Sequence, residues 1–210
     1  MTAAAIFAIA TALVGDLSGK FLAEYQPEKL AAAEWHFETT TEAPLILGGI
    51  LTENNEVKYA LEIPYALSIL AHGSPGAEVI GLEEFPEEDR PPLIVHYMFD
   101  AMVAIGVLLA LISIAYVIFQ RKRKWNELNK PLLRSIVLGG PLAMLAIEAG
   151  WFFAEEGRQP WILRGYMRTA EGATSSPHVD LMLYLFILLY LILAISVVTV
   201  LRKNVQVQSG

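Results

Sequence analysis

Three long apolar runs constrain this chain more than any other feature. They cover residues 91–119, 131–154 and 181–201. An α-helix rises about 1.5 Å per residue, so each run can cross a hydrocarbon core about 30 Å thick. Hydrophobic residues make up 55% of the chain, which counts against the alternative of three helices buried in a soluble core. We therefore expect an all-α integral membrane protein, a transmembrane helix bundle with full spans at residues 91–120, 135–156 and 179–202.

The first 15 residues form a shorter apolar run. It holds about 14 apolar residues before Asp16, or roughly 21 Å of helix, which falls short of a comfortable crossing. A signal peptide is the obvious alternative, but the run lacks the basic residues with which such peptides begin. The pattern predicts the end of a fourth transmembrane helix. We expect the chain to be a fragment, a split gene product or one piece of a larger bundle.

Charge is distributed unevenly along the chain, whose net charge is -7. Residues 16–90 carry 15 acidic and 4 basic side chains, whereas residues 121–134 carry 6 basic and 1 acidic. Because basic loops stay in the cytoplasm, residues 121–134 and the tail at 203–210 are predicted to be cytoplasmic, with residues 16–90 and 157–178 outside. One short basic loop gives no support for binding nucleic acid. The absence of cysteine excludes disulfides and thiolate metal ligands.

The loop at residues 16–90 is too long, at about 75 residues, to be a passive connection. Pro27 is expected at the first position of a short helix. Residues 50–61 predict two short strands around a turn at 53–56. Residues 63–71 predict a short apolar helix at the membrane interface.

Glu148, Trp151 and Glu155 are spaced by three and four residues, so they share one helix face. Glu148 lies near the middle of its apolar run and Glu155 at the outer end. A carboxylate in apolar surroundings costs several kcal/mol unless it is protonated, paired or bound to a metal. These acids are therefore candidates for a function such as proton transfer, or for structural pairing with another helix.

Gly157 and Pro160 are expected to end the same helix, which places Arg158 at the membrane boundary. There the guanidinium group can hold a carboxylate, or it can reach the interface as a snorkelling side chain beside Trp161.

Other candidates lie in the first full span and in the long loop. Met102 offers a thioether, which is a soft metal ligand but is more commonly a packing residue in an apolar span. Asp100 is an acid within the apolar run, and His96 near its outer end is either a ligand or an interfacial hydrogen-bonding residue. Lys29 and Glu34 are about 140° apart on a helix, so they are either two solvated charges or two sides of a site for a small polar ligand.

Four stretches of the chain are informative together, namely GDLSGKFLAEYQPEKLAAAE, IPYALSILAHGSP, RPPLIVHYMFDAMVAIG and GWFFAEEGRQPW. They resemble subunit I of the cytochrome bd quinol oxidases, and the GRQPW run is the most specific. The resemblance covers essentially the whole chain but only the C-terminal half of the usual subunit. It implies three cofactors, a low-spin haem b, a high-spin haem b and haem d, with quinol as the substrate.

The resemblance implies a role for each matching residue. Met102 matches the axial methionine of the low-spin haem b, Glu155 a ligand of a high-spin haem iron, and Trp151 a residue of electron transfer between haems. Lys29 and Glu34 match the quinol-binding pair of the loop called the Q-loop, here without its long insertion. Asp100 stands where many relatives have arginine. The family's run beside the haems supplies Arg158, Gln159 and Trp161.

The expected activity is that of a terminal respiratory oxidase in a prokaryotic cell membrane. Quinol would be oxidised at the outer face and dioxygen reduced to water, with Glu148 as a proton relay or haem-pocket acid. The implied partners are the N-terminal half of subunit I, on the same or a separate chain, a second oxidase subunit and membrane lipid, and the chain alone would be inactive. Two alternatives remain: a non-catalytic membrane subunit without a full haem set, and an ion or solute transporter that uses Glu148 and Asp100.

Overall fold

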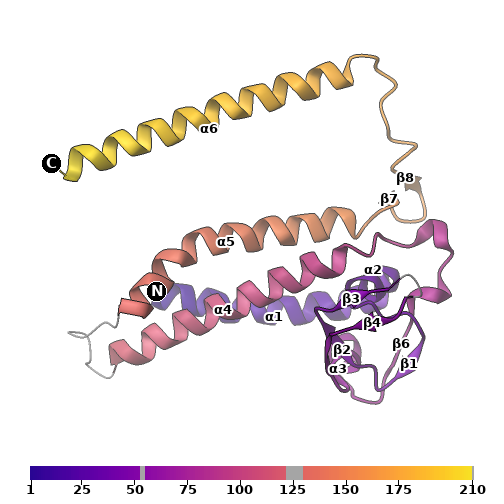
Figure 1. Cartoon of the computed structure of the whole chain (residues 1–210). Helices are drawn as coiled ribbons and strands as arrows, with labels where there is room; N and C mark the ends of the chain where they lie inside the picture. The colour runs from indigo at the N-terminus through magenta and orange to yellow at the C-terminus, as the bar shows by residue number, and fades with distance from the viewer. Residues whose placement is uncertain (53–54, 122–129, 210) are drawn as a thin grey trace. The chain divides into compact units, whose positions relative to one another are not determined.

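The computed structural model describes residues 1–52, 55–121 and 130–209, with side chains described as far as residue 203 (Figure 1). The chain divides into two compact units, Met1–Thr169 and Ala170–Gly210. Residues 53–54, at the turn of the predicted hairpin, residues 122–129 of the predicted basic loop, and residue 210 of the predicted tail lie outside the described residues.

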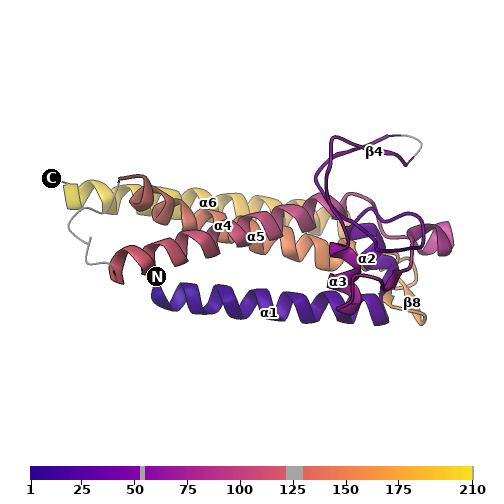
Figure 2. The ribbon, with the colours of Figure 1, turned by 90° about the horizontal axis from the view of Figure 1, so that it is seen from below.

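The first unit is built on three long helices that pack side by side, α1 (Thr2–Tyr25), α4 (Val95–Arg121) and α5 (Lys130–Glu156) (Figures 1 and 2). The first of them runs ten residues beyond the expected end at residue 15. Asp16 and Lys20, one turn apart, form an ion pair on its exposed surface, so these charges do not interrupt the helix.

The second unit consists mainly of one helix, α6 (Val179–Ser209), which continues through residues predicted to form a tail. Four helices in the described part of the chain are long and apolar enough to cross a membrane, namely α1, α4, α5 and the Val179–Lys203 portion of α6. This confirms the expected helical membrane architecture. The sides of the membrane on which the loops lie stay a prediction.

Between α1 and α4 the chain forms a loop module of short elements at one end of the helices (Figures 1 and 2). Pro27 begins α2, as the sequence predicts, and the expected hairpin forms from β3 and β4, extended by β2 and β5. The predicted apolar helix is α3. The bounds are α2 Pro27–Ala33, β1 Thr40–Thr41, β2 Leu45–Leu47, β3 Ile50–Leu51, β4 Val57–Lys58, β5 Leu61–Ile63, α3 Ala66–His72, β6 Glu78–Val79, and the 3-10 helices η1 Leu82–Glu84 and η2 Glu87–Asp89.

Helix α2 lies at the centre of the packing in this module. Its alanines Ala31, Ala32 and Ala33 are fully buried and belong to one cluster with Val95 of α4 and Phe153 of α5. Methyl side chains allow the helix backbones to approach closely. The sequence KLAAAE therefore brings Lys29 at one end against α5 and Glu34 at the other end against α4.

Candidate functional site

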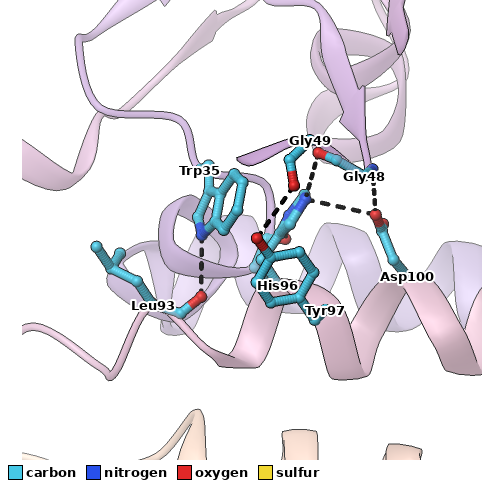
Figure 3. Close-up of polar contacts among 8 residues, drawn as sticks. Trp35, Gly48, Gly49, Leu93, His96, Tyr97 and Asp100 are labelled. Atoms are coloured by element: carbon cyan, nitrogen blue, oxygen red, sulfur yellow. Dashed lines mark hydrogen bonds and ion pairs between the residues drawn. The ribbon is translucent and has the colours of Figure 1, made fainter. Parts of the chain in front are cut away.

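The end of α2 places aromatic and polar groups against the start of α4. The N–H of His36 donates to the carbonyl of Ala31 at 2.9 Å, which closes the helix in a Schellman-type turn. Trp35 occupies the left-handed position of this turn, with φ 46°. Its ring stacks on His96 of α4 at 4.0 Å, and its indole N–H donates to the carbonyl of Leu93 at 2.9 Å (Figure 3). A strained residue is thus held where the loop meets the membrane helix.

His96 and Tyr97 of α4 form hydrogen bonds with main-chain carbonyl groups of α2 and of the turn between β2 and β3. His96 Nδ1 lies 2.7 Å from the carbonyl oxygen of Ala33 and Nε2 lies 3.2 Å from that of Gly48, while the Tyr97 hydroxyl donates to Gly49 at 3.0 Å (Figure 3). Both glycines have positive φ, 65° and 105°, a conformation that favours glycine. His96 forms hydrogen bonds, as one of the two alternatives from the sequence expected, but it is fully buried, and it anchors the β2–β3 turn to α4.

Glu34 is the most deeply buried charged residue in this region, with a side chain that is 0% exposed. Neither of its carboxylate oxygens has a hydrogen-bond partner in the described part of the chain, and neither does Oδ1 of Asp100. Burial, and next the neighbouring Asp100, raise the pKa of Glu34 to about 8, whereas the Ile46 amide opposes the rise without reaching hydrogen-bond geometry. Glu34 is thus a neutral acid at neutral pH.

This burial predicts a pH dependence of stability. Glu34 ionises near 4.5 in the unfolded chain and near 8 in the fold, so between these values the folded protein holds the extra proton and stability falls as pH rises. The contribution is fully present below about pH 4.5 and is lost as the pH passes about 8. We expect the midpoint of thermal unfolding of the assembled complex to fall across this window. Glu34→Gln should flatten the decline, and parallel profiles for parent and variant would contradict the assignment.

Lys29, at the other end of α2, contacts α5. Its amino group donates to the carbonyl of Ala154 at 3.0 Å and lies 4.8 Å from the centre of the Phe153 ring. A Cβ on Gly157 would come within 2.6 Å of the Phe153 carbonyl oxygen and 2.8 Å of Lys29 Cε, so this position requires glycine. Burial, and then the Arg158 charge, lower the pKa of Lys29, while Glu155 acts in the opposite direction.

The interpretation of Lys29 and Glu34 as two solvated charges is therefore wrong. Lys29 is 8% exposed and Glu34 fully buried, because the alanines between them pack into the core and draw both ends of α2 inward. The two side chains face different helices, Lys29 toward the end of α5 and Glu34 toward Asp100 on α4.

The end of α5 carries the remaining polar candidates. Glu155 and Arg158 form an ion pair at 2.5 Å, with both side chains 44% exposed. Gln159 accepts a hydrogen bond from Thr169 at 2.6 Å. The guanidinium group of Arg168 lies 4.8 Å from the centre of the Trp161 ring. Trp161 opens a short hairpin of β7 (Trp161–Leu163) and β8 (Met167–Arg168), which follows the helix as Gly157 ends it.

Glu148 and Trp151 lie on an exposed face of α5, and Trp151 is 63% exposed. Met102 of α4 lies between the two helices, where a Cβ on Gly150 would come within 2.8 Å of its sulfur. The thioether of Met102 is a donor of a kind that binds haem iron, and Glu155 presents a partly exposed anionic oxygen at the end of α5. The residues present thus suit the cofactor implied by the sequence.

An open cleft of about 240 Å³ lies where α5 ends, with Gln159 and Trp161 in its wall. Its lining includes Arg158 and Arg164, and Arg164 forms an ion pair with Glu28 of α2 at 2.6 Å. Sequence reasoning missed Glu28, Arg164 and Trp35. Glu28 and Arg164 are separated by more than a hundred residues, and Trp35 follows α2 without a periodic signal, so no local pattern indicates these contacts.

The sequence matches the family described as cytochrome bd terminal oxidase subunit I over residues 1–209. It is 42% identical over 202 residues to the putative cytochrome bd menaquinol oxidase subunit I of Bacillus subtilis (strain 168), covering 96% of this chain and 46% of that protein. It is 28% identical over 209 residues to the cytochrome bd ubiquinol oxidase subunit 1 of the same organism, covering 92% and 44%.

The fold is similar to a chain in the structure of bd oxidase from Geobacillus thermodenitrificans. The TM-score is 0.84 with 66% sequence identity, over 95% of this chain and 46% of that one. The chain thus spans less than half the length of these relatives.

Proposed function

The chain belongs to the family of cytochrome bd terminal oxidase subunit I, and from this premise we propose that it forms part of a haem-containing oxidoreductase that oxidises quinol and reduces dioxygen to water. The position of α2 carries the proposal. This one short helix sets Lys29 against the turn that bears Glu155, and Glu34 against the helix that bears Met102. The proposed substrate residues and the proposed haem ligands therefore meet through α2.

The quinol site comprises Lys29 and Glu34. Lys29 supplies a buried positive charge and Glu34 a buried carboxyl group with free acceptor atoms. A hydroxyl group is a donor that matches such acceptors, and a desolvated carboxyl group strengthens the contact. Two relatives have names that specify a menaquinol and a ubiquinol oxidase. For this chain we propose quinol as a class.

The haems would be held through Met102 and Glu155, with Trp151, Arg158, Gln159 and Trp161 beside them. When bound, the low-spin haem b, the high-spin haem b and haem d supply electron transfer and the reduction of dioxygen. The thioether of Met102 would be the soft donor for the low-spin iron, and Glu155 would offer an anionic oxygen to a high-spin iron. Arg158, paired with Glu155, orients this carboxylate and balances its charge.

Proton transfer is assigned to the face of α5. Glu148 stands there two turns before Glu155, and Trp151 lies between them. In the prokaryotic cell membrane, residues 16–90 lie outside, and residues 121–134 and the C-terminus lie in the cytoplasm. Quinol protons then leave outside while protons for water enter from the cytoplasm, with Glu148 as their relay.

The proposed partners complete the bundle. The exposed face of α5 carries Met144, Ile147 and Trp151, each more than half exposed, as expected of a surface that other helices and cofactors cover. The N-terminal half of subunit I, on the same or a separate chain, and a second oxidase subunit supply that cover, together with membrane lipid.

Replacing Lys29 by methionine in the assembled oxidase tests the quinol site. Methionine keeps a flexible apolar stem and removes the buried charge, so we expect quinol-driven oxygen consumption to fall about tenfold or more, the effect of losing a charged hydrogen bond. Oxygen consumption with an artificial electron donor should persist. Lys20→Met, at an exposed pair in α1, is the matched control. Unchanged quinol oxidation in Lys29→Met would refute the assignment.

A further inference from the structure

The carboxyl groups of Glu34 and Asp100 lie near each other where the loop module meets α4. Both carboxylate oxygens of Glu34 and Oδ1 of Asp100 are buried, and within the described residues none of the three has a partner. The two side chains come from different elements, Glu34 from the end of α2 and Asp100 from the second turn of α4. Buried polar atoms of this kind are costly unless a partner enters, so the cluster lacks one component.

Asp100 is held in place through its other oxygen. The N–H of Gly48 donates to Oδ2 at 2.5 Å, and His96 Nε2 lies 3.4 Å from the same atom (Figure 3). His96 is fixed in turn by the Ala33 carbonyl and by stacking on Trp35. These contacts occupy Oδ2 and leave Oδ1 oriented but unused. Because Asp100 is already held in place, its Oδ1 can accept a hydrogen bond from a ligand without first becoming ordered.

We propose that Asp100 is a further substrate-contacting residue: its Oδ1 accepts a hydrogen bond from one hydroxyl group of the quinol, and the neutral Glu34 contacts the same hydroxyl. The inference rests on the proposed function and adds a residue to the same site. A diphenol presents one O–H donor to Oδ1 of Asp100, and its hydroxyl oxygen can accept from the O–H of the neutral Glu34. A buried water molecule presents the same donor chemistry, and the experiment below separates the two sources.

The position of Asp100 on α4 supports this assignment. Asp100 and Met102 are about 200° apart around the helix but only about 3 Å apart along it. Asp100 therefore faces Gly48 of the loop module, while Met102 faces Gly150 of α5. A hydroxyl group bound at Asp100 is held on the helix that carries the proposed ligand of the low-spin haem.

The test is a double-mutant cycle in the assembled, haem-loaded oxidase. Asp100→Asn keeps the shape of the side chain and removes the carboxylate acceptor, so the KM for quinol should rise about tenfold or more. Glu34→Gln should raise it similarly. If both residues bind the same hydroxyl, the double variant will show an effect clearly smaller than the product of the two single effects.

Haem absorption spectra and a control variant make the result specific. Glu62→Gln, at an exposed position of β5 in the same loop module, should leave KM unchanged. If Asp100→Asn retains the haem bands and a parental KM while Glu34→Gln raises KM, the free oxygens bind water only and the inference is overturned. The proposed function would then still stand. Absence of quinol oxidation in the parent oxidase would instead overturn the proposed function.

A second variant covers the case in which Asp100→Asn loses haem. Asp100→Glu retains the charge and moves the acceptor by about 1.5 Å, one carbon–carbon bond. Binding of naphthol, which has one hydroxyl group and is not turned over, is then measured by competition with quinol. We expect naphthol to bind about tenfold more weakly to Asp100→Glu than to the parent oxidase. Equal binding would overturn the inference.

Discussion

Replacing Glu155 by glutamine in the assembled oxidase is expected to abolish the absorption bands of one high-spin haem and to lower oxygen reduction about a hundredfold or more. The amide has the same shape but offers no negative charge to iron. Changes to groups that merely support a metal ligand already cost about 10–100-fold in affinity or activity. The measurement is an optical spectrum of the purified complex together with oxygen consumption.

Breaking the ion pair between Glu155 and Arg158 cannot by itself produce such a loss. Both side chains are 44% exposed, and exposed pairs contribute about 0–1 kcal/mol, or less than tenfold. Glu156→Gln, one residue further along α5, is the matched control and should retain the haem bands. Intact haem bands and oxygen consumption in Glu155→Gln would rule out ligation of iron by this carboxylate.

Replacing Met102 by leucine is the second change with a large expected effect. Leucine fills about the same volume between α4 and α5 but has no sulfur to donate, so packing survives while ligation does not. We expect the low-spin haem b band to be lost or shifted, and quinol-driven turnover to fall at least about tenfold. Reduced-minus-oxidised spectra and a redox titration measure the first effect.

Met98→Leu provides the comparison, because Met98 lies one turn earlier on α4 and packs against the core cluster of α2. Its replacement should leave the low-spin haem spectrum unchanged. A normal spectrum in both variants would show that the low-spin iron takes its ligand from elsewhere.

Much of the architecture could be predicted, because the length of an apolar run can be read directly from consecutive residues. The three apolar runs predict α4, α5 and α6, Pro27 marks the start of α2, and Gly157 marks the end of α5. The hairpin from Ile50 to Lys58 follows from its polar turn. The length of α1 could not be predicted from hydrophobicity, because the Asp16–Lys20 pair lets the helix continue on an exposed surface.

The candidate site was less predictable, because its geometry depends on contacts between distant residues. The residue types of Lys29 and Glu34 suggested solvated charges, and only the burial of the alanines between them turns both inward. The carboxylate of Asp100 is held by the amide of Gly48, 52 residues away in the sequence, so no local pattern indicates this contact. The resemblance identified residue roles that spacing alone left open, and those roles for Met102 and Glu155 stay predictions.

The fully buried alanines of α2 also limit how the sequence can change. A larger side chain at residues 31–33 would push the loop module away from the two long helices, because each alanine methyl group already fills the space available to it. Mutations in this segment would therefore need compensating losses of volume near Val95 or Phe153. Sequence changes in the loop module and in the long helices are thereby linked, so a loop module taken from a distant relative should fold here only together with the helix residues that face it.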